Sequence, residues 1–368
     1  MEPFKNLFNP AIAEKISSAI KRNYSQFNTR SFLKEIGPAL DALELKERVS
    51  FISNRLHTYL PQDPKISIPL LVKALKQNDN DSIGVEGFAI WPLTHFVAVY
   101  GVDEFDLSMC ALKEMTKLFT AEFAVRTFFI QDQERTLKYF KIWLSDESDH
   151  VRRLVSEGSR PLLPWGQKLH VFVENPEITW KLLEKLKNDT SEYVRKSVAN
   201  HINDHSKNHP DYVIEKLLKW HLSRSITPEL TWVIKHASRS LIKKGYKKAF
   251  ILHGVEDSKI KVHDQKIINK KMKLGESLNV RVSLENLSRK LATIILDHEL
   301  HLLKSNNKHS IKVFKGRKIS LKSGEIIQVE MSIPIKFVTT RVYYPGEQFW
   351  NIKINGIGQM PQSFLLYR

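Results

Sequence analysis

Residues 149 to 166 read Asp-His-Val-Arg-Arg-Leu-Val-Ser-Glu-Gly-Ser-Arg-Pro-Leu-Leu-Pro-Trp-Gly. The first half of this stretch has helical periodicity, because Val151, Leu154 and Val155 fall on one face. Gly158 is expected to end the helix, and the two prolines that follow prevent its restart. The stretch therefore predicts an amphipathic helix followed by a stiff loop that presents Trp165.

Glu157 is unusual in this helix, because a carboxylate in the last turn lies at the negative end of the helix dipole. A cation should therefore compensate its charge. Arg153, four residues earlier, and Arg160, three residues later, are the candidates within the chain. A cationic ligand is an alternative, and so is an ordinary structural ion pair with Arg153.

The charge of the chain is concentrated in its last third. The 368 residues, enough for two or three domains, carry a net charge of +17. From Ser258 onward there are 20 lysines and arginines against 8 aspartates and glutamates, a balance of +12. A strongly basic module beside a nearly balanced one favours a polyanionic partner, most often nucleic acid, although a simply soluble basic surface is the alternative.

The composition also excludes several classes of protein. A single cysteine, Cys110, excludes an intrachain disulfide framework and a multi-cysteine metal site. Its apolar neighbours lead us to expect a buried structural thiol. The first residues lack a signal-peptide pattern, and no apolar run reaches the length of a membrane span. We expect a cytoplasmic protein that does not enter a membrane.

The first two thirds of the chain are predicted to be helical. Residues 10–120 read as successive helices, and a short aromatic-or-His, apolar, Arg motif then recurs at 123–126, 150–153 and 193–196. Each copy is paired with a second helix, and another helical pair spans about 228–250. Helix pairs that recur in this way are typical of a HEAT-like α-solenoid, whose stacked pairs form a binding surface.

The pattern changes to short β-strands near residue 257. The predicted strands, punctuated by Gly and Asn, cover residues 259–262, 278–284, 293–298, 326–331, 338–344 and 349–354. This spacing predicts an immunoglobulin-like β-sandwich. The fold class is therefore mainly α, with a helical domain at 1–256 and a basic sandwich at 257–368.

Two basic segments of the predicted sandwich are expected to be turns at its ends. One is residues 304–308, and the other contains Lys315, Arg317 and Lys318. Turns of this charge are suited to phosphate contacts, and ordinary solvated turns are the alternative.

The block at 156–161, Ser-Glu-Gly-Ser-Arg-Pro, followed by Leu-Pro-Trp-Gly at 163–166, resembles the AlkC family of bacterial DNA-alkylation-repair glycosylases. Residues 123–126 and 200–204 also resemble that family, as does the order of the two modules. The resemblance implies a monofunctional glycosylase that removes cationic alkylated bases, typically 3-methyladenine. It implies no metal and no cofactor. We expect the protein to act as a monomer on double-stranded DNA that contains such bases.

The resemblance also assigns residues. It implies three acidic site residues, an aromatic wall and two orienting or phosphate-binding arginines: Glu122, Glu157, Asp204, Trp165, Arg152 and Arg160. Such chemistry is reasonable, because a positively charged base leaves easily, a carboxylate stabilises the oxocarbenium-like sugar, and an indole attracts a cation.

Each of these residues also has a structural alternative. Glu122 can pair with Arg126 one turn later in a helix. Asp204 can cap a turn, and Trp165 can fill the edge of a core. Arg152 occupies the same repeat position as Arg195, which favours pairing between repeats.

Two competing functions follow from the same residues. The first is a non-enzymatic solenoid that binds nucleic acid or protein. The second is a metal-dependent nuclease that uses the three acidic residues as ligands. His201, His205 and His209 recur every four residues near Asp204, but no His-Glu-x-x-His motif is present, so we do not expect a metal site.

Overall fold

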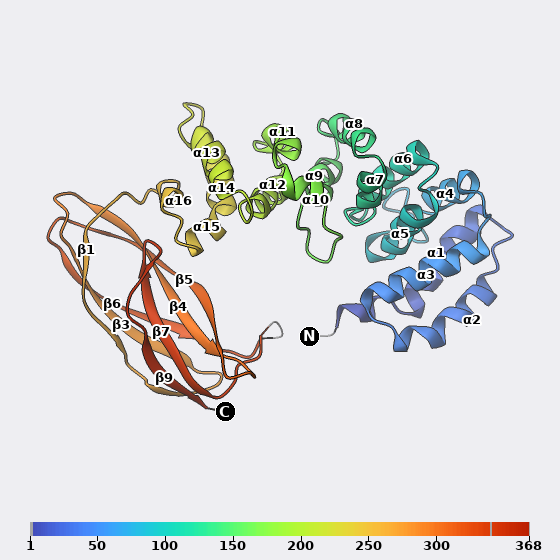
Figure 1. Ribbon diagram of the computed structural model, residues 1–368. Coiled ribbons are helices and arrows are strands. Elements are labelled where there is room, and N and C mark those ends of the chain that lie inside the picture. The colour runs from blue at the N-terminus through green and yellow to red at the C-terminus, as the bar shows by residue number, and fades with distance from the viewer. Residues whose placement is uncertain (1–2, 339–340, 368) are drawn as a thin grey trace. The chain divides into compact units, whose positions relative to one another are not determined.

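The computed structural model describes residues 3–338 and 341–367. The chain divides into two compact units, Met1–Asn208 and His209–Arg368. Helices α1 to α12 belong to the first unit, and helices α13 to α16 and the strands belong to the second (Figure 1). Among the described residues, no helix is long and apolar enough to cross a membrane.

The first unit is a succession of short helices, drawn from blue to green in Figure 1. Helices close in sequence pack on one another, such as α1 on α2, α3 on α5, and α4 on α6. This arrangement confirms the prediction of a HEAT-like array. The bounds are α1 Pro10–Asn23, α2 Thr29–Ala39, α3 Leu45–Tyr59, α4 Pro64–Lys73, α5 Trp91–Tyr100, α6 Phe105–Thr116, α7 Val125–Gln131, α8 Gln133–Trp143, α9 Asp149–Gly158, α10 His170–Glu174, α11 Glu177–Leu186 and α12 Glu192–His205.

Helix α9 forms where its sequence predicts. Val151, Leu154 and Val155 are completely buried, and Gly158 is the last residue of the helix. A Cβ atom at Gly158 would lie 2.6 Å from Cγ2 of Val125 on α7. The glycine is therefore required by the close packing of α9 on α7, in addition to ending the helix.

Cys110 corrects one prediction, because its side chain is exposed on α6. The buried face of this helix contains Phe105, Met109 and Leu112. Each residue of an α-helix is rotated by about 100° from the previous one. Cys110 therefore points away from the core despite its apolar neighbours in sequence, and the prediction of a buried thiol is wrong.

The second unit contains four helices and a β-sandwich. The helices are α13 Pro210–His221, α14 Pro228–Ala237, α15 Arg239–Lys243 and α16 Lys247–Ile251. The strands are β1 Ile260–Ile267, β2 Lys271–Lys273, β3 Ser277–Asn286, β4 Ala292–Leu303, β5 His309–Leu321, β6 Ile326–Pro334, β7 Gly346–Ile354, β8 Ile357–Gly358 and β9 Gln362–Tyr367. The last helix ends at Ile251 and the first strand begins at Ile260. The division of the chain into a helical domain at 1–256 and a sandwich domain at 257–368 stays a prediction.

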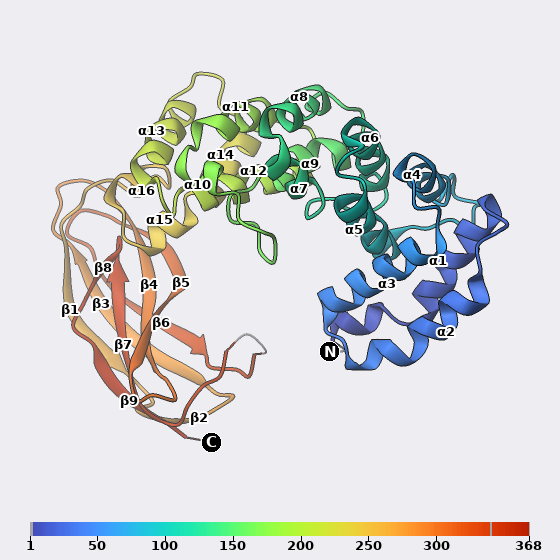
Figure 2. The same ribbon diagram turned by 45° about the vertical axis from the view of Figure 1, so that its right-hand side comes forward.

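The sandwich has a three-stranded sheet, β1-β3-β6, and a larger sheet, β2-β9-β7-β4-β5, with β8 paired to β7 (Figure 2). Strand β3 alternates as predicted, because Leu278, Val280 and Val282 are buried between exposed residues. Trp350 on β7 is completely buried in the same core. The predicted sandwich is confirmed.

Two of the sandwich predictions are wrong. Residues 315–318 form part of strand β5, and Gly316 lies at a bulge where its N–H donates to Asp297 Oδ1 at 3.1 Å. Residues 304–308 do form a turn, in which Lys304 N donates to Lys308 O at 2.9 Å. The segment predicted as a strand at 338–344 has only an isolated bridge between Val338 and Arg341, and residues 339–340 lie outside the described part of the chain.

Candidate active site

The three acidic residues predicted for the site lie in one network of ion pairs. Arg153 joins Glu122 to Glu157, with Nη1 2.5 Å from Glu122 Oε2 and Nη2 3.5 Å from Glu157 Oε1. Arg160 joins Glu157 to Asp204, with Nη1 2.7 Å from Glu157 Oε1 and Nε 2.8 Å from Asp204 Oδ2. Tertiary structure thus gathers carboxylates that are 35 and 47 residues apart in sequence.

The centre of this network is almost completely shielded from solvent. Glu157 is 5% exposed, Asp204 2% and Arg160 8%. Burial acts to lower the pKa of Arg160, but the attraction of Glu157 and then of Asp204 outweighs it and the pKa is raised. A buried charge is tolerated only when it is paired, and the alternation of acidic and basic side chains supplies these pairs in the interior.

Further donors also bind each of the three carboxylates. Ser197 Oγ donates to Glu157 Oε2 at 2.6 Å, and Lys207 Nζ lies 2.9 Å from Asp204 Oδ1. Thr120 Oγ1 donates to Glu122 Oε2 at 2.8 Å. Each carboxylate is therefore held in one orientation before any substrate arrives, which is the preorganisation that electrostatic catalysis requires.

Helices α9 and α12 position the network by packing directly on each other. His201 Nδ1 lies 2.9 Å from the carbonyl oxygen of Ser156, and Ser197 Oγ lies 2.9 Å from Ser156 Oγ. The next residue, Glu157, forms ion pairs with both Arg153 and Arg160, the two cations expected from its position at the negative end of the helix dipole. This confirms the sequence argument for an intramolecular compensating charge.

Arg126 holds the loop that follows α9. Its guanidinium donates to the carbonyl oxygens of Gly158 at 3.0 Å, Arg160 at 2.8 Å and Gln167 at 2.5 Å. Burial, and then the charge of Arg160, lower the pKa of Arg126 to about 10. The local pair of Glu122 with Arg126 is not formed, since Glu122 binds Arg153, so that structural alternative is wrong.

Trp165 lies on this loop and is 65% exposed, so it does not fill the edge of a core. Its φ of +63° is a conformation that residues other than glycine rarely adopt. Lys46 Nζ donates to its carbonyl oxygen. The indole lines a hollow of about 180 Å³ together with Trp91 and Phe123, whose rings are stacked at 5.1 Å. Phe123 adjoins Glu122 in sequence, which links this aromatic hollow to the network.

Arg152 is placed outside the network. Its guanidinium makes two bonds to the Asp189 carboxylate, at 2.7 and 3.0 Å, and donates to the carbonyl oxygens of Asp146 and Glu147. Arg195 repeats part of this pattern on the carbonyl oxygen of Asp189 at 2.7 Å. The geometry favours a clamp between repeats, and a role of Arg152 in DNA binding stays a prediction.

Several residues of the site were not predicted. Tyr193 and Ser197 lie one turn apart on α12, and the guanidinium carbon of Arg153 is 4.9 Å from the centre of the Tyr193 ring. Burial raises the pKa of Tyr193. The signal that could have found them is the polar face of α12, on which Tyr193, Ser197 and Asp204 recur at helical spacing.

The histidines of α12 are occupied by protein partners. His201 is bonded to Ser156, and His205 Nε2 lies 2.9 Å from Thr179 Oγ1. Within residues 3–338 and 341–367, no group of three or more His, Cys, Asp or Glu side chains is arranged to hold a metal ion. The spacing of these histidines therefore serves the packing of α12 on its neighbours.

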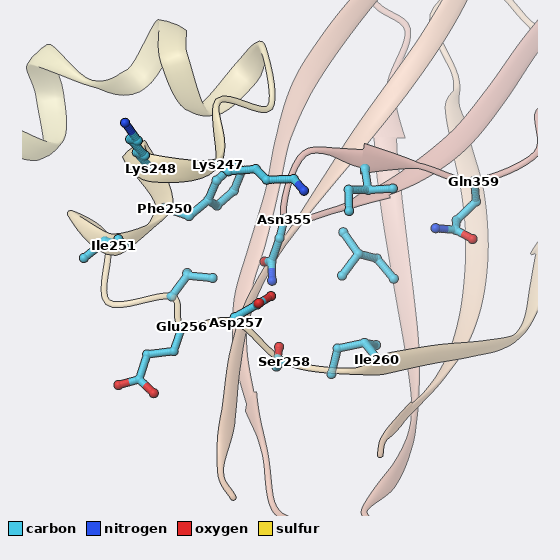
Figure 3. Close-up of a pocket in the computed structure, with 13 residues that line it drawn as sticks. Lys247, Lys248, Phe250, Ile251, Glu256, Asp257, Ser258, Ile260, Asn355 and Gln359 are labelled. Atoms are coloured by element: carbon cyan, nitrogen blue, oxygen red, sulfur yellow. The ribbon is translucent and has the colours of Figure 1, made fainter. Parts of the chain in front are cut away.

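A separate hollow of about 420 Å³ lies at α16 and the β7–β8 turn of the second unit (Figure 3). It is lined by side chains of both charge signs, including Lys247, Lys248, Glu256 and Asp257. None of the predicted site residues lines it. Its mixed charge makes it a poor match to a polyanion.

Comparisons with known proteins find relatives of both modules of the chain. A family model described as the C-terminal Ig-like domain of the uncharacterised protein YhaZ matches residues 261–368. The uncharacterized protein YhaZ of Bacillus subtilis (strain 168) is 32% identical over 358 residues, which cover 97% of each chain. The structure of Pseudomonas fluorescens alkylpurine DNA glycosylase AlkC, bound to DNA containing an abasic site analog, is 35% identical over 100% of both chains with a TM-score of 0.90. Because these similarities extend over the helical array and the sandwich together, the chain belongs to the AlkC family.

Proposed function

We propose that this protein is a monofunctional DNA glycosylase that hydrolyses the N-glycosidic bond of cationic N-alkylated bases, such as 3-methyladenine, in double-stranded DNA. The observation that carries the proposal is the preorganised network of Glu122, Glu157 and Asp204 with Arg153 and Arg160. The similarity to a glycosylase solved on DNA with an abasic site analog supports it. We place the protein in the bacterial cytoplasm as a monomer.

The chemistry needs a negative group more than an acid. A base that carries a positive charge is already a good leaving group, so its departure requires little general-acid help. The sugar becomes oxocarbenium-like as the bond breaks, and a fixed carboxylate stabilises that charge and can hold the attacking water. We assign these roles to the Glu122, Glu157 and Asp204 network, with Glu157 at its centre.

We assign to Trp165 the selectivity for cationic over neutral bases. Its exposed indole, beside a hollow walled by Trp91 and Phe123, offers an aromatic face to a cation. A cation–π contact contributes about 0.5–2 kcal/mol and is absent for a neutral base. Excision of cationic adducts should therefore exceed excision of uncharged ones, and equal rates would contradict this role.

The test is release of methylated bases from alkylated duplex DNA by the wild type and by Glu157→Gln. The amide keeps the shape of the side chain but removes its charge, and we expect a loss of about 10²–10³ in rate. The control is Glu174→Gln, which makes the same change on an exposed residue at the end of α10 and should retain full activity. Full-rate repair by Glu157→Gln, at an unchanged melting temperature, would sink the proposal.

The product separates this function from its competitors. We expect an abasic site without strand cleavage, no adduct trapped by borohydride, and the same rate with a chelator present. A chelator-sensitive strand break would identify the metal-dependent nuclease. Binding of alkylated DNA without any release of base would indicate a non-enzymatic scaffold.

A further inference from the structure

A hollow of about 460 Å³ lies in the second unit, at α14, α15 and the β4–β5 ladder. Helix α15 lies beside the ends of β4 and β5 in both ribbon views (Figures 1 and 2). Its lining includes six cationic side chains and one carboxylate: Lys235, Arg239, Lys243, Lys315, Arg317, Lys318 and Asp297.

A β-bulge forms part of the lining of this hollow. The register of the ladder shifts between Leu296 and Asp297, so Leu296 pairs with Arg317 and Gly316 is an extra residue. A Cβ atom at Gly316 would lie 2.1 Å from the Leu296 carbonyl oxygen, so the bulge depends on glycine. Lys315, before the extra residue, and Arg317 and Lys318, after it, all line the hollow.

Asp297, the one carboxylate of the lining, offsets only part of the positive charge of the hollow. In the described part of the chain, five of the cations form no ion pair with a carboxylate: Lys235, Lys243, Lys315, Arg317 and Lys318. The positive charge also affects His253, which lines the hollow. Burial, and then the charges of nearby lysines, lower the pKa of its imidazole to about 4. Like charges held together at this density are stabilised by a bound anion.

One wall of the hollow is aromatic. Trp232 and His236 on α14 are stacked, with ring centres 4.8 Å apart and planes at 11°. Trp232 is 38% exposed and lines the hollow, so part of its indole can meet a ligand. Cations beside a partly exposed aromatic ring suit a phosphate that carries a sugar or a base better than they suit a small inorganic anion.

We infer that this hollow binds a phosphate group, and that the group is a phosphodiester of the DNA backbone lying against Trp232. The choice of DNA rests on the proposed function. The inference adds the helical cations Lys235, Arg239 and Lys243 to the three strand residues predicted from sequence, and it makes the site a single cradle at the β4–β5 bulge. It is separate from the carboxylate network, which lies in the other unit.

The test compares two double variants of the full chain in DNA binding over a series of salt concentrations. Lys315→Gln/Arg317→Gln removes two charges from the hollow, and Lys271→Gln/Lys273→Gln removes two from β2, at the opposite edge of the same sheet. Anisotropy of a labelled duplex with an abasic analogue gives the affinity. We expect the plot of log affinity against log salt to become shallower by about 1–2 for the hollow variant and to stay unchanged for the control.

Inorganic phosphate distinguishes the source of the ligand. At constant ionic strength, it should raise the melting temperature of the wild type but not of Lys315→Gln/Arg317→Gln. A different outcome is that phosphate stabilises only the wild type while both double variants keep the wild-type salt dependence of DNA binding. That result would overturn the assignment to DNA and identify the ligand as a free anion. If neither measurement separates the hollow variant from the control, the inference is wrong. Salt dependence that requires the hollow, without any release of methylated base, would disprove the proposed function and leave this site standing.

Discussion

Glu157 shows how one side chain depends on its partners. Two arginines bind its Oε1 and the Ser197 hydroxyl binds its Oε2. Removing one partner of a buried ion pair leaves an uncompensated charge and costs about 3–5 kcal/mol. Truncation of Arg153 or Arg160 would therefore lower stability and activity together. Glu157→Gln should cost less stability, because Arg153 keeps its pair with Glu122 and Arg160 its pair with Asp204.

Trp165→Leu tests the indole at the scale of a single residue. Both residues carry a Cβ atom, so the cost of the positive φ is retained, and the exposed side chain contributes little to stability. Loss of a cation–π contact of about 0.5–2 kcal/mol corresponds to a 2- to 30-fold slower excision of cationic bases. Single-turnover rates on methylated DNA measure this. A fall in melting temperature that parallels the loss in rate would indicate a structural role instead.

His298 gives the sandwich a dependence on pH. Its side chain is buried, its Nδ1 accepts from Trp350 Nε1 at 3.2 Å, and burial, with a smaller effect of Arg317, lowers its pKa to about 4. The unfolded chain binds this proton near pH 6.5 and the folded chain does not, so stability is lost as pH falls from about 6.5 to 4. The slope is about 1.4 kcal/mol per pH unit for this group.

The His298→Asn variant should lack the contribution of His298 to the fall in unfolding free energy between about pH 6.5 and 4. Urea unfolding followed by circular dichroism at several pH values between 7 and 4 measures it. Identical slopes for the wild type and the variant would show that the histidine is protonated equally in both states.

At the scale of the element, α9 couples packing to the site. Its apolar face and Gly158 set its distance from α7, and the polar side of its last turn carries Glu157 to α12. A helix this short is stabilised mainly by tertiary contacts rather than by its own propensity. A change in its packing should therefore reach the carboxylate network.

Gly158→Ala tests this coupling. The added methyl would lie 2.6 Å from Val125 Cγ2, so we expect a loss of about 1–3 kcal/mol in stability and slower excision. Gly37→Ala in α2 is the control, because a Cβ atom there meets nothing within 4 Å and should be neutral or stabilising by up to about 1 kcal/mol. Thermal unfolding and excision by both variants measure the effects. Equal behaviour of the two would show that the α7–α9 contact does not matter.

At the scale of the whole molecule, affinity and chemistry depend on different charges. The last third of the chain carries a balance of +12 and is suited to phosphates, whereas the carboxylate network pairs its charges in the interior. Salt screens exposed charges strongly and buried pairs weakly.

Added salt should therefore separate the two functions. The affinity for DNA should fall by orders of magnitude over a moderate range of salt, because cations that contact phosphates release counterions. The single-turnover rate at saturating protein should stay nearly constant. Excision measured against protein concentration at each salt concentration gives both quantities, and a saturating rate that falls together with affinity would contradict the separation.

Local pattern predicted much of this molecule. Helical periodicity found α9, and alternation found β3, because each depends on residues near in sequence that share one face. The same reasoning failed for Cys110, whose direction depends on the turn of α6, and for residues 315–318, where glycine and basic residues resemble a turn but form a bulged strand.

Periodicity, composition and the helix dipole are local properties, so they were enough to predict a helical array, a basic sandwich and a cation near Glu157. The pairing of each cation with its carboxylate could be found only in the folded chain. Glu122 binds Arg153, 31 residues away, rather than its neighbour Arg126, because the packing of α9 brings Arg153 within reach while Arg126 is taken up by three loop carbonyls. Ion pairs follow distance in space, which a linear sequence does not specify.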